Sequence, residues 1–129
     1  MFKQIAFYKR KPGMTPEEFR DYYENMHVKV RLSSMKLPGL RRYVRRYLTP
    51  ITDPVTDIQR HAGFDVVTEL WFDDKAAWEN YRKVSLDPEV RRIAGEDEDQ
   101  FLDRDHIYHH LIDECDLTFP SEGPNYHSD

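Results

Sequence analysis

The chain has 129 residues, of which 39 % are hydrophobic and 13 % aromatic, and this is enough for one domain with a single core. Its 24 acidic and 19 basic residues give a net charge of −5, which argues against a general affinity for nucleic acid or anionic membranes. The single cysteine permits no internal disulfide, and no apolar run approaches signal-peptide length or the roughly 20 residues that cross a bilayer. We therefore expect a cytoplasmic protein without nucleic-acid or membrane partners.

The N-terminal part of the chain predicts a strand, a turn and a well-marked helix. Residues 5–8 favour a strand, which ends at a Pro-Gly turn signal. Thr15 then precedes Pro16 and Glu18, so an N-cap hydroxyl, a proline at the first helical position and a capping-box carboxylate coincide. The break at residues 37–39 ends this helical region. Its apolar face repeats at helical spacing and consists of Phe19, Tyr22, Tyr23, Met26 and Val30.

Residues 40–48 and 64–72 predict two further strands. The first alternates, so that one face carries Tyr43 and Tyr47 and the opposite face carries Val44 and Leu48. The second strand is the clearest in the chain, because one of its faces is almost wholly apolar. Its other face carries Asp65, Val67, Glu69 and Trp71.

The C-terminal part predicts more helix and a last strand. Asp73 or Asp74 caps a second helix, and Asp87-Pro88 opens a short helical turn before an acidic patch at residues 95–105. Residues 106–113 read as a fourth strand. We expect one domain over residues 1–116 and an extended tail over residues 117–129, which is rich in Pro, Ser and Gly.

This order of elements predicts an α+β, ferredoxin-like β-α-β-β-α-β protomer, with four antiparallel strands and the helices on one face. The other face of such a sheet is uncovered. Because Val67 and Trp71 flank Glu69 on that face, a second copy packed face to face would bury them. The sequence therefore predicts a homodimer that encloses a cavity suited to a small ligand.

Several segments resemble the EthD-type dimeric α+β barrel proteins. They are YKRKPGMTPEEFRDYYENMHVKV, LPGLRRYVRRYLTP, the FDVVTELWF strand and FLDRD. The resemblance implies a ferredoxin-like protomer and a homodimer with a central cavity. It also implies a similarity to fungal polyketide-tailoring enzymes that act without a cofactor, among them decarboxylases, dehydratases and cyclases. The fold alone does not choose between these activities.

Three residues are the candidates for proton transfer. The resemblance places His27 at the mouth of the barrel, where an imidazole can act as acid or base, although a histidine at a helix C-terminus can also simply cap it. Glu69 lies among apolar neighbours, where burial would raise its pKa. The alternative is a salt bridge from Glu69 to one of the arginines in the preceding strand, Arg41, Arg42, Arg45 and Arg46. His61, in the loop before the third strand, can assist or be merely exposed.

Aromatic and imidazole side chains are the candidates for substrate binding. A planar ring could stack on aromatic residues whose hydroxyls bind its oxygen atoms, although core packing is the commoner role of such residues. These candidates are Tyr8, Tyr43, Tyr47, Trp71 and His109. We expect no metal, because His106 and His110 are about 13 Å apart along an extended strand and His109 points the opposite way.

The residues therefore favour a cofactor-independent lyase or cyclase that acts on an aromatic or polyketide-type small molecule. His27 would transfer the proton, Glu69 or His61 would assist, and an enol would form as water or carbon dioxide leaves. No nucleophile elbow and no glycine-rich dinucleotide loop is present. The alternative is a non-catalytic protein that holds a small molecule or serves an oxidative pathway.

Overall fold

The computed structural model describes residues 1–125 of the chain. Its sheet has the strand order β2-β3-β1-β4, and each neighbouring pair of strands is antiparallel. The elements are β1 (Phe2–Arg10), α1 (Pro16–Tyr22), the π-helical turn η1 (Tyr23–His27), α2 (Val28–Ser34), β2 (Leu40–Tyr47), β3 (Val66–Phe72), α3 (Lys75–Ser85), α4 (Pro88–Glu98) and β4 (Leu102–Leu111). The predicted α+β, ferredoxin-like arrangement is confirmed.

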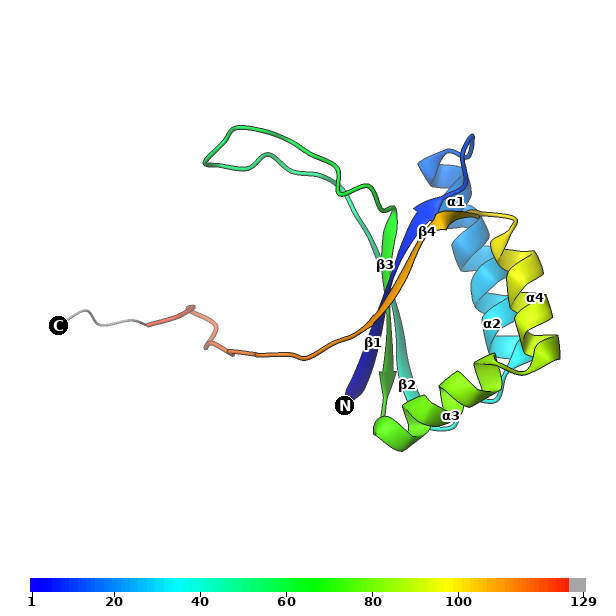
Figure 1. Cartoon of the computed structure of the whole chain (residues 1–129). Coiled ribbons are helices and arrows are strands. Elements are labelled where there is room, and N and C mark those ends of the chain that lie inside the picture. Colours follow the sequence, from blue (N-terminus) through cyan, green and yellow to red (C-terminus); the bar gives the residue numbers. More distant parts are fainter. Residues whose placement is uncertain (126–129) are drawn as a thin grey trace.

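All the helices cover the same face of the sheet (Figure 1). The loop between β2 and β3 and the segment that follows β4 extend away on the opposite side (Figure 1). Residues 112–125 of that segment form no helix or strand, and the last four residues of the predicted tail lie outside the described residues. Among residues 1–125, no helix is long and apolar enough to cross a membrane.

The strand register decides which side chains meet the helices. Along β3, burial alternates strictly, and the buried residues are Val66, Thr68, Leu70 and Phe72. Tyr8 and Ala6 of β1 lie opposite two of them, so these residues share the helix side of the sheet. The opposite face, which we call the open face, carries Lys3, Ile5, Phe7, Arg42, Val44, Arg46, Val67, Glu69, Trp71, Tyr108 and His110.

The first helix begins as its sequence predicts but does not end at His27. The Thr15 side chain accepts from the backbone of Glu18, and the Glu18 carboxylate accepts from the backbone of Thr15, which completes the capping box. The helical path then continues through η1 into α2 and ends at Ser34. His27 therefore lies inside a helix, and the interpretation of it as a C-terminal cap is wrong.

The π-helical turn changes which side chains face the core. The backbone N–H of Val28 donates to the carbonyl of Tyr23, five residues back, so this turn holds one residue more than an α-helical turn. As a result Met26, expected on the buried face, is 50 % exposed, and His27 is 3 % exposed instead. π-helical turns occur frequently at functional sites.

The fourth helix is longer than the short turn that the sequence predicts. Asp87 caps α4, which continues to Glu98 and includes part of the acidic patch. Arg92 forms ion pairs with Glu89 and Glu96 one turn away on either side, which offsets repulsion among the exposed carboxylates. β4 correspondingly starts at Leu102, where it pairs with Arg10, rather than at residue 106.

Replacement of Gly39 tests the close contact between the start of β2 and α3. Gly39 has φ +85°, and an added Cβ would lie 2.6 Å from Cβ of Ala77. We expect Gly39→Ala to lower the free energy of unfolding by about 3 kcal/mol, since backbone strain and overpacking add. Gly13, with φ +87° and no neighbour near its added Cβ, is the matched control. Gly13→Ala should cost about 1 kcal/mol in urea denaturation, and equal losses would disprove the contact.

Candidate functional site

A small cavity lies between the sheet and the helices. It has a volume of about 20 Å³ and is lined by Gln4, Ala6, Tyr8, His27, Arg31, Tyr43, Thr68, Leu70 and Tyr81. We call it the inner cavity; this space admits about one water molecule. A second hollow of about 290 Å³, here called the vestibule, opens to the surface between α3, α4 and β4. Because Tyr8, Arg31 and Tyr81 line both spaces, the vestibule lies directly beside the inner cavity on its surface side.

A buried histidine and aspartate form the centre of this site. Nδ1 of His27 lies 2.5 Å from Oδ2 of Asp97, and the two side chains are 3 % and 4 % exposed. The other carboxylate oxygen of Asp97 accepts a hydrogen bond from the Tyr22 hydroxyl at 2.8 Å. A carboxylate at Nδ1 selects the tautomer that carries its proton there, so Nε2 is left as a base.

The second ring nitrogen of His27, Nε2, has no hydrogen-bond partner among residues 1–125. Among the described residues, every side-chain nitrogen or oxygen that is completely buried has a hydrogen-bond partner. Nε2 must therefore touch accessible space, and His27 lines the inner cavity. The rings of Tyr23 and Phe101 pack against the imidazole at 4.7 and 4.8 Å between centroids, which holds its plane in place.

Tyrosine hydroxyls supply neutral hydrogen-bond donors around the same cavity. Tyr43 shares a hydrogen bond of 2.9 Å with Tyr23, and the Tyr23 hydroxyl lies 2.7 Å from Oγ1 of Thr68. The Tyr8 hydroxyl has no partner among the described residues, so it too faces accessible space. Burial raises the pKa of Tyr8 well above its usual range and that of Tyr43 to about 12. Both phenols are therefore protonated at neutral pH.

Glu69 and Trp71 do not belong to this cavity, because they lie on the open face of the sheet. The Glu69 carboxylate accepts hydrogen bonds from Arg46 at 2.8 Å and from the Trp71 indole at 2.9 Å. Burial acts to raise its pKa, but these two donors and the charges of Arg46 and Lys3 outweigh it and lower the pKa. The expectation of a raised pKa is thus wrong, and the alternative of a salt bridge is confirmed. His27 and Glu69 are separated by the sheet.

Trp71 is covered by cations on the open face. The ammonium of Lys3 lies 3.5 Å from the centroid of its ring, and the guanidinium carbon of Arg42 lies 4.3 Å away. In the protomer these cations occupy the ring surface on which a planar substrate was expected to stack.

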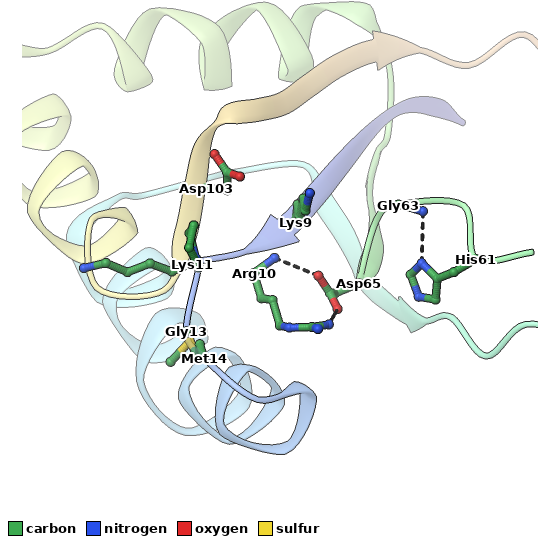
Figure 2. Close-up of a pocket in the computed structure, with 10 residues that line it drawn as sticks. Lys9, Arg10, Lys11, Gly13, Met14, His61, Gly63, Asp65 and Asp103 are labelled. Carbon is green, nitrogen blue, oxygen red and sulfur yellow. Dashed lines mark hydrogen bonds and ion pairs between the residues drawn. The ribbon is translucent and has the colours of Figure 1, made fainter.

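His61 lies in a separate surface groove (Figure 2). This groove has a volume of about 550 Å³ and is formed by the turn after β1 and the loop before β3. One of its cations is paired with one of its carboxylates. The Arg10 guanidinium donates to Asp65 at 2.6 Å, and Nδ1 of His61 accepts from the backbone of Gly63 at 2.9 Å (Figure 2). His61 thus shapes its own loop and is not brought together with His27.

The other two predicted residues have different surroundings. His109 lines the vestibule and packs edge-on against Tyr8 at 6.0 Å. Burial, followed by the charges of Arg31 and Arg82, lowers the pKa of His109, so the imidazole is neutral at pH 7. The Tyr47 hydroxyl instead donates to the Glu24 carboxylate at 2.7 Å, and this carboxylate also binds Arg45. Tyr47 lines neither the inner cavity nor the vestibule.

The cavity therefore unites Tyr8, Tyr43, His27 and, at its entrance, His109. Sequence reasoning missed Arg31, Asp97 and Tyr81. Asp97 follows Val90 and Ile93 at helical spacing, which places an acidic residue on the core-facing side of a helix. That spacing was the signal for Asp97, and it was overlooked because the neighbouring residues are also acidic. Arg31 follows His27 by one helical turn, so the two side chains share a helix face. The expected apolar face did not include them, because the π-helical turn changes which later residues point to the core.

An antiparallel sheet of this order, with a polar cavity under its helices, defines an α+β protein of the ferredoxin-like class. The chain belongs to the EthD domain family, whose model matches residues 11–105. Among curated proteins, no significant match is found.

Solved structures show the same fold. An EthD family protein of Bacillus halodurans is 22 % identical, with a TM-score of 0.57 over 89 % of this chain and 100 % of that one. An Arabidopsis thaliana protein is 14 % identical, with a TM-score of 0.57 over 92 % and 100 %. A dimeric ferredoxin-like protein of unknown function from Jannaschia sp. is 17 % identical, with a TM-score of 0.52 over 88 % and 98 %. At these identities the likeness concerns the fold.

The protonated tyrosines make stability fall at high pH. The folded state keeps the Tyr43 proton up to a pKa of about 12, whereas the unfolded state releases it near 10.0. This contribution is complete below pH 10 and is lost as the pH rises towards 12. Urea denaturation should show Tyr43→Phe losing less stability over this window than the unchanged protein, by up to about 1.4 kcal/mol per pH unit. Parallel pH profiles would rule out a buried neutral Tyr43.

Proposed function

We propose that the protein is a cofactor-independent acid–base catalyst, a lyase or cyclase for an aromatic or polyketide-type small molecule. The observation that carries this proposal is the buried His27–Asp97 pair, whose histidine lines a cavity together with the neutral phenols of Tyr8 and Tyr43. Proton transfer at carbon needs an oriented base and a hydrogen-bond donor for the oxygen that becomes negative. The site supplies both.

A dehydration can be written with the residues of this cavity. It requires the lining side chains to move apart as the substrate enters, because the cavity itself holds about one water molecule. Nε2 of His27 takes a proton from the carbon beside a substrate carbonyl, and the carbonyl oxygen becomes an enolate that accepts from the Tyr8 hydroxyl. The charged His27 then returns the proton to the hydroxyl on the next carbon. That carbon–oxygen bond breaks, water leaves and a double bond forms. Asp97 stabilises the imidazolium between the two steps.

The role first assigned to Glu69 passes to Asp97 in this proposal. Asp97 is within hydrogen-bond distance of His27, whereas Glu69 is bound to Arg46 across the sheet. His109 is an assisting group at the entrance, because a neutral imidazole can accept or donate a hydrogen bond. A protein that only holds its ligand would use the same cavity, and turnover separates this alternative from catalysis.

We also propose that the open face is covered by a second copy of the chain. Phe7, Phe64 and Tyr108 form an aromatic cluster on this side, with centroid distances of 5.4 and 5.7 Å between neighbouring rings. Tyr108 is 44 % exposed in the protomer, Val67 lies opposite Phe7, and Ile5 lies on the same face of the sheet. Apolar surface of this kind marks a protein interface. Relatives of the same fold are described as dimeric, which supports this partner.

Turnover by His27 variants tests the catalytic proposal. Candidate polyketide intermediates are incubated with the purified protein, and mass spectrometry follows the loss of water or carbon dioxide. We expect His27→Gln to lower the rate by at least about 100-fold, since the base is lost, and Asp97→Asn to lower it by about tenfold or more. His61→Gln, in the separate groove, is the control and should leave the rate unchanged. Full activity in His27→Gln would refute the mechanism.

A charge on the open face tests the dimer. Val67→Arg places a cation beside the aromatic cluster, and we expect it to convert a dimer into a monomer in light-scattering measurements. Leu86→Arg, which alters a 61 % exposed residue at the end of α3 on the helix side, is the matched control. A monomeric unchanged protein, or a dimer that persists in Val67→Arg, would contradict the proposed interface.

A further inference from the structure

Arg31 is a cation with almost no partner inside the protein. Its Nη2 donates to the Tyr81 hydroxyl at 2.7 Å, and this is its only hydrogen bond to a described residue. A guanidinium has five N–H donors, and arginines in protein interiors are usually paired with carboxylates. No acidic side chain within residues 1–125 forms an ion pair with Arg31, although many of the other arginines have one.

The unused donors of Arg31 face the ligand space. In the described part of the chain, every completely buried side-chain nitrogen has a hydrogen-bond partner. The remaining N–H groups of Arg31 have none, so they must reach accessible volume. Arg31 lines both the inner cavity and the vestibule. It therefore stands where a ligand would pass from the surface towards His27.

The vestibule is cationic, although the whole protein has a net charge of −5. Besides Arg31, it is lined by Arg82 and Arg91, neither of which forms an ion pair with a described residue. Its single carboxylate, Glu98, is bound to a fourth arginine, Arg104, at 2.7 Å. Several unpaired cations that line one hollow attract and orient an anion.

We infer that Arg31 anchors a carboxylate group of the substrate, and that this group enters through the vestibule between α3, α4 and β4. This inference rests on the proposed acid–base site. A planar guanidinium binds a carboxylate through two parallel hydrogen bonds. Arg31 follows His27 by one helical turn and both line the inner cavity, so the anchored carboxylate directs the rest of the ligand towards His27.

The anchor also selects among the reactions that the fold leaves open. Carbon dioxide leaves as the negative charge of its carboxylate moves into the rest of the molecule. An ion pair with Arg31 stabilises that charge in the ground state more than in the transition state, so it would slow decarboxylation of the anchored group. The carboxylate is therefore a binding group that remains in the product. Dehydration or cyclisation by proton transfer remains compatible with it.

Binding of 2-hydroxybenzoate and of its neutral amide, 2-hydroxybenzamide, tests the anchor. Isothermal calorimetry on the full chain gives both dissociation constants, and nitrogen-15 NMR maps the site. We expect the carboxylate to bind at least about tenfold more tightly than the amide, with shifts at Arg31 and Tyr81. Arg31→Met should abolish this preference, and Arg31→Lys should keep only part of it. Arg60→Met, which removes an exposed cation from the β2–β3 loop, should retain it.

Several results would overturn the inference: equal affinity for acid and amide in the unchanged protein, shifts that map outside the vestibule, or a preference that survives in Arg31→Met. If Arg31→Met does not fold, the first two readouts and Arg31→Lys decide. The outcome is separate from that of the catalytic proposal. His27→Gln should bind 2-hydroxybenzoate like the unchanged protein although it lacks turnover, whereas turnover without a carboxylate preference would remove only the anchor.

Discussion

The contact between His27 and Asp97 determines how this site is built. It joins the long helical segment of residues 16–34 to α4, which follows in the sequence by some fifty positions, over the same face of the sheet. A buried carboxylate without a hydrogen-bond donor is costly, and so is a buried imidazole N–H without an acceptor. Each partner therefore makes the burial of the other tolerable, and the Tyr22 hydroxyl satisfies the second oxygen of Asp97. The cavity lies beside this pair.

The two faces of the sheet carry different chemistry. On the helix side, the inner cavity is lined by phenol, amide and imidazole groups that can exchange protons or hydrogen bonds, and by the cation of Arg31, which forms no ion pair with a described residue. On the open face, charged groups neutralise each other, as Arg46 and Glu69 do, or lie over the indole of Trp71. Such pairs suit a surface that another protein surface covers. Strand alternation alone separates these roles, because each successive residue of β3 points to the opposite side.

Strong local signals made most of the fold predictable. The Thr15 capping box, the alternation in β3 and the Asp-Pro start of α4 each have a local physical cause, and each is found in the structure. The set of residues that forms the site was harder to predict from the sequence. Glu69 and Trp71 were correctly placed on the face that the helices leave open. The misplaced residue was His27, which was expected at the mouth of a cavity on that face but lies on the helix side. Asp97 was predicted only as part of an acidic patch, since its partner is seventy residues away.

The π-helical turn has a consequence for comparing this chain with its relatives. The extra residue within η1 rotates everything after it by about 100° relative to an uninterrupted α-helix. A relative without this turn would present a different side chain at the place of His27, even where the flanking residues align without a gap. Equivalent positions in this family are therefore matched by the direction of the side chain into the cavity rather than by counting along the helix. Evolution can alter the chemistry of such a site by inserting or deleting a single residue, with every side chain of the cavity left unsubstituted.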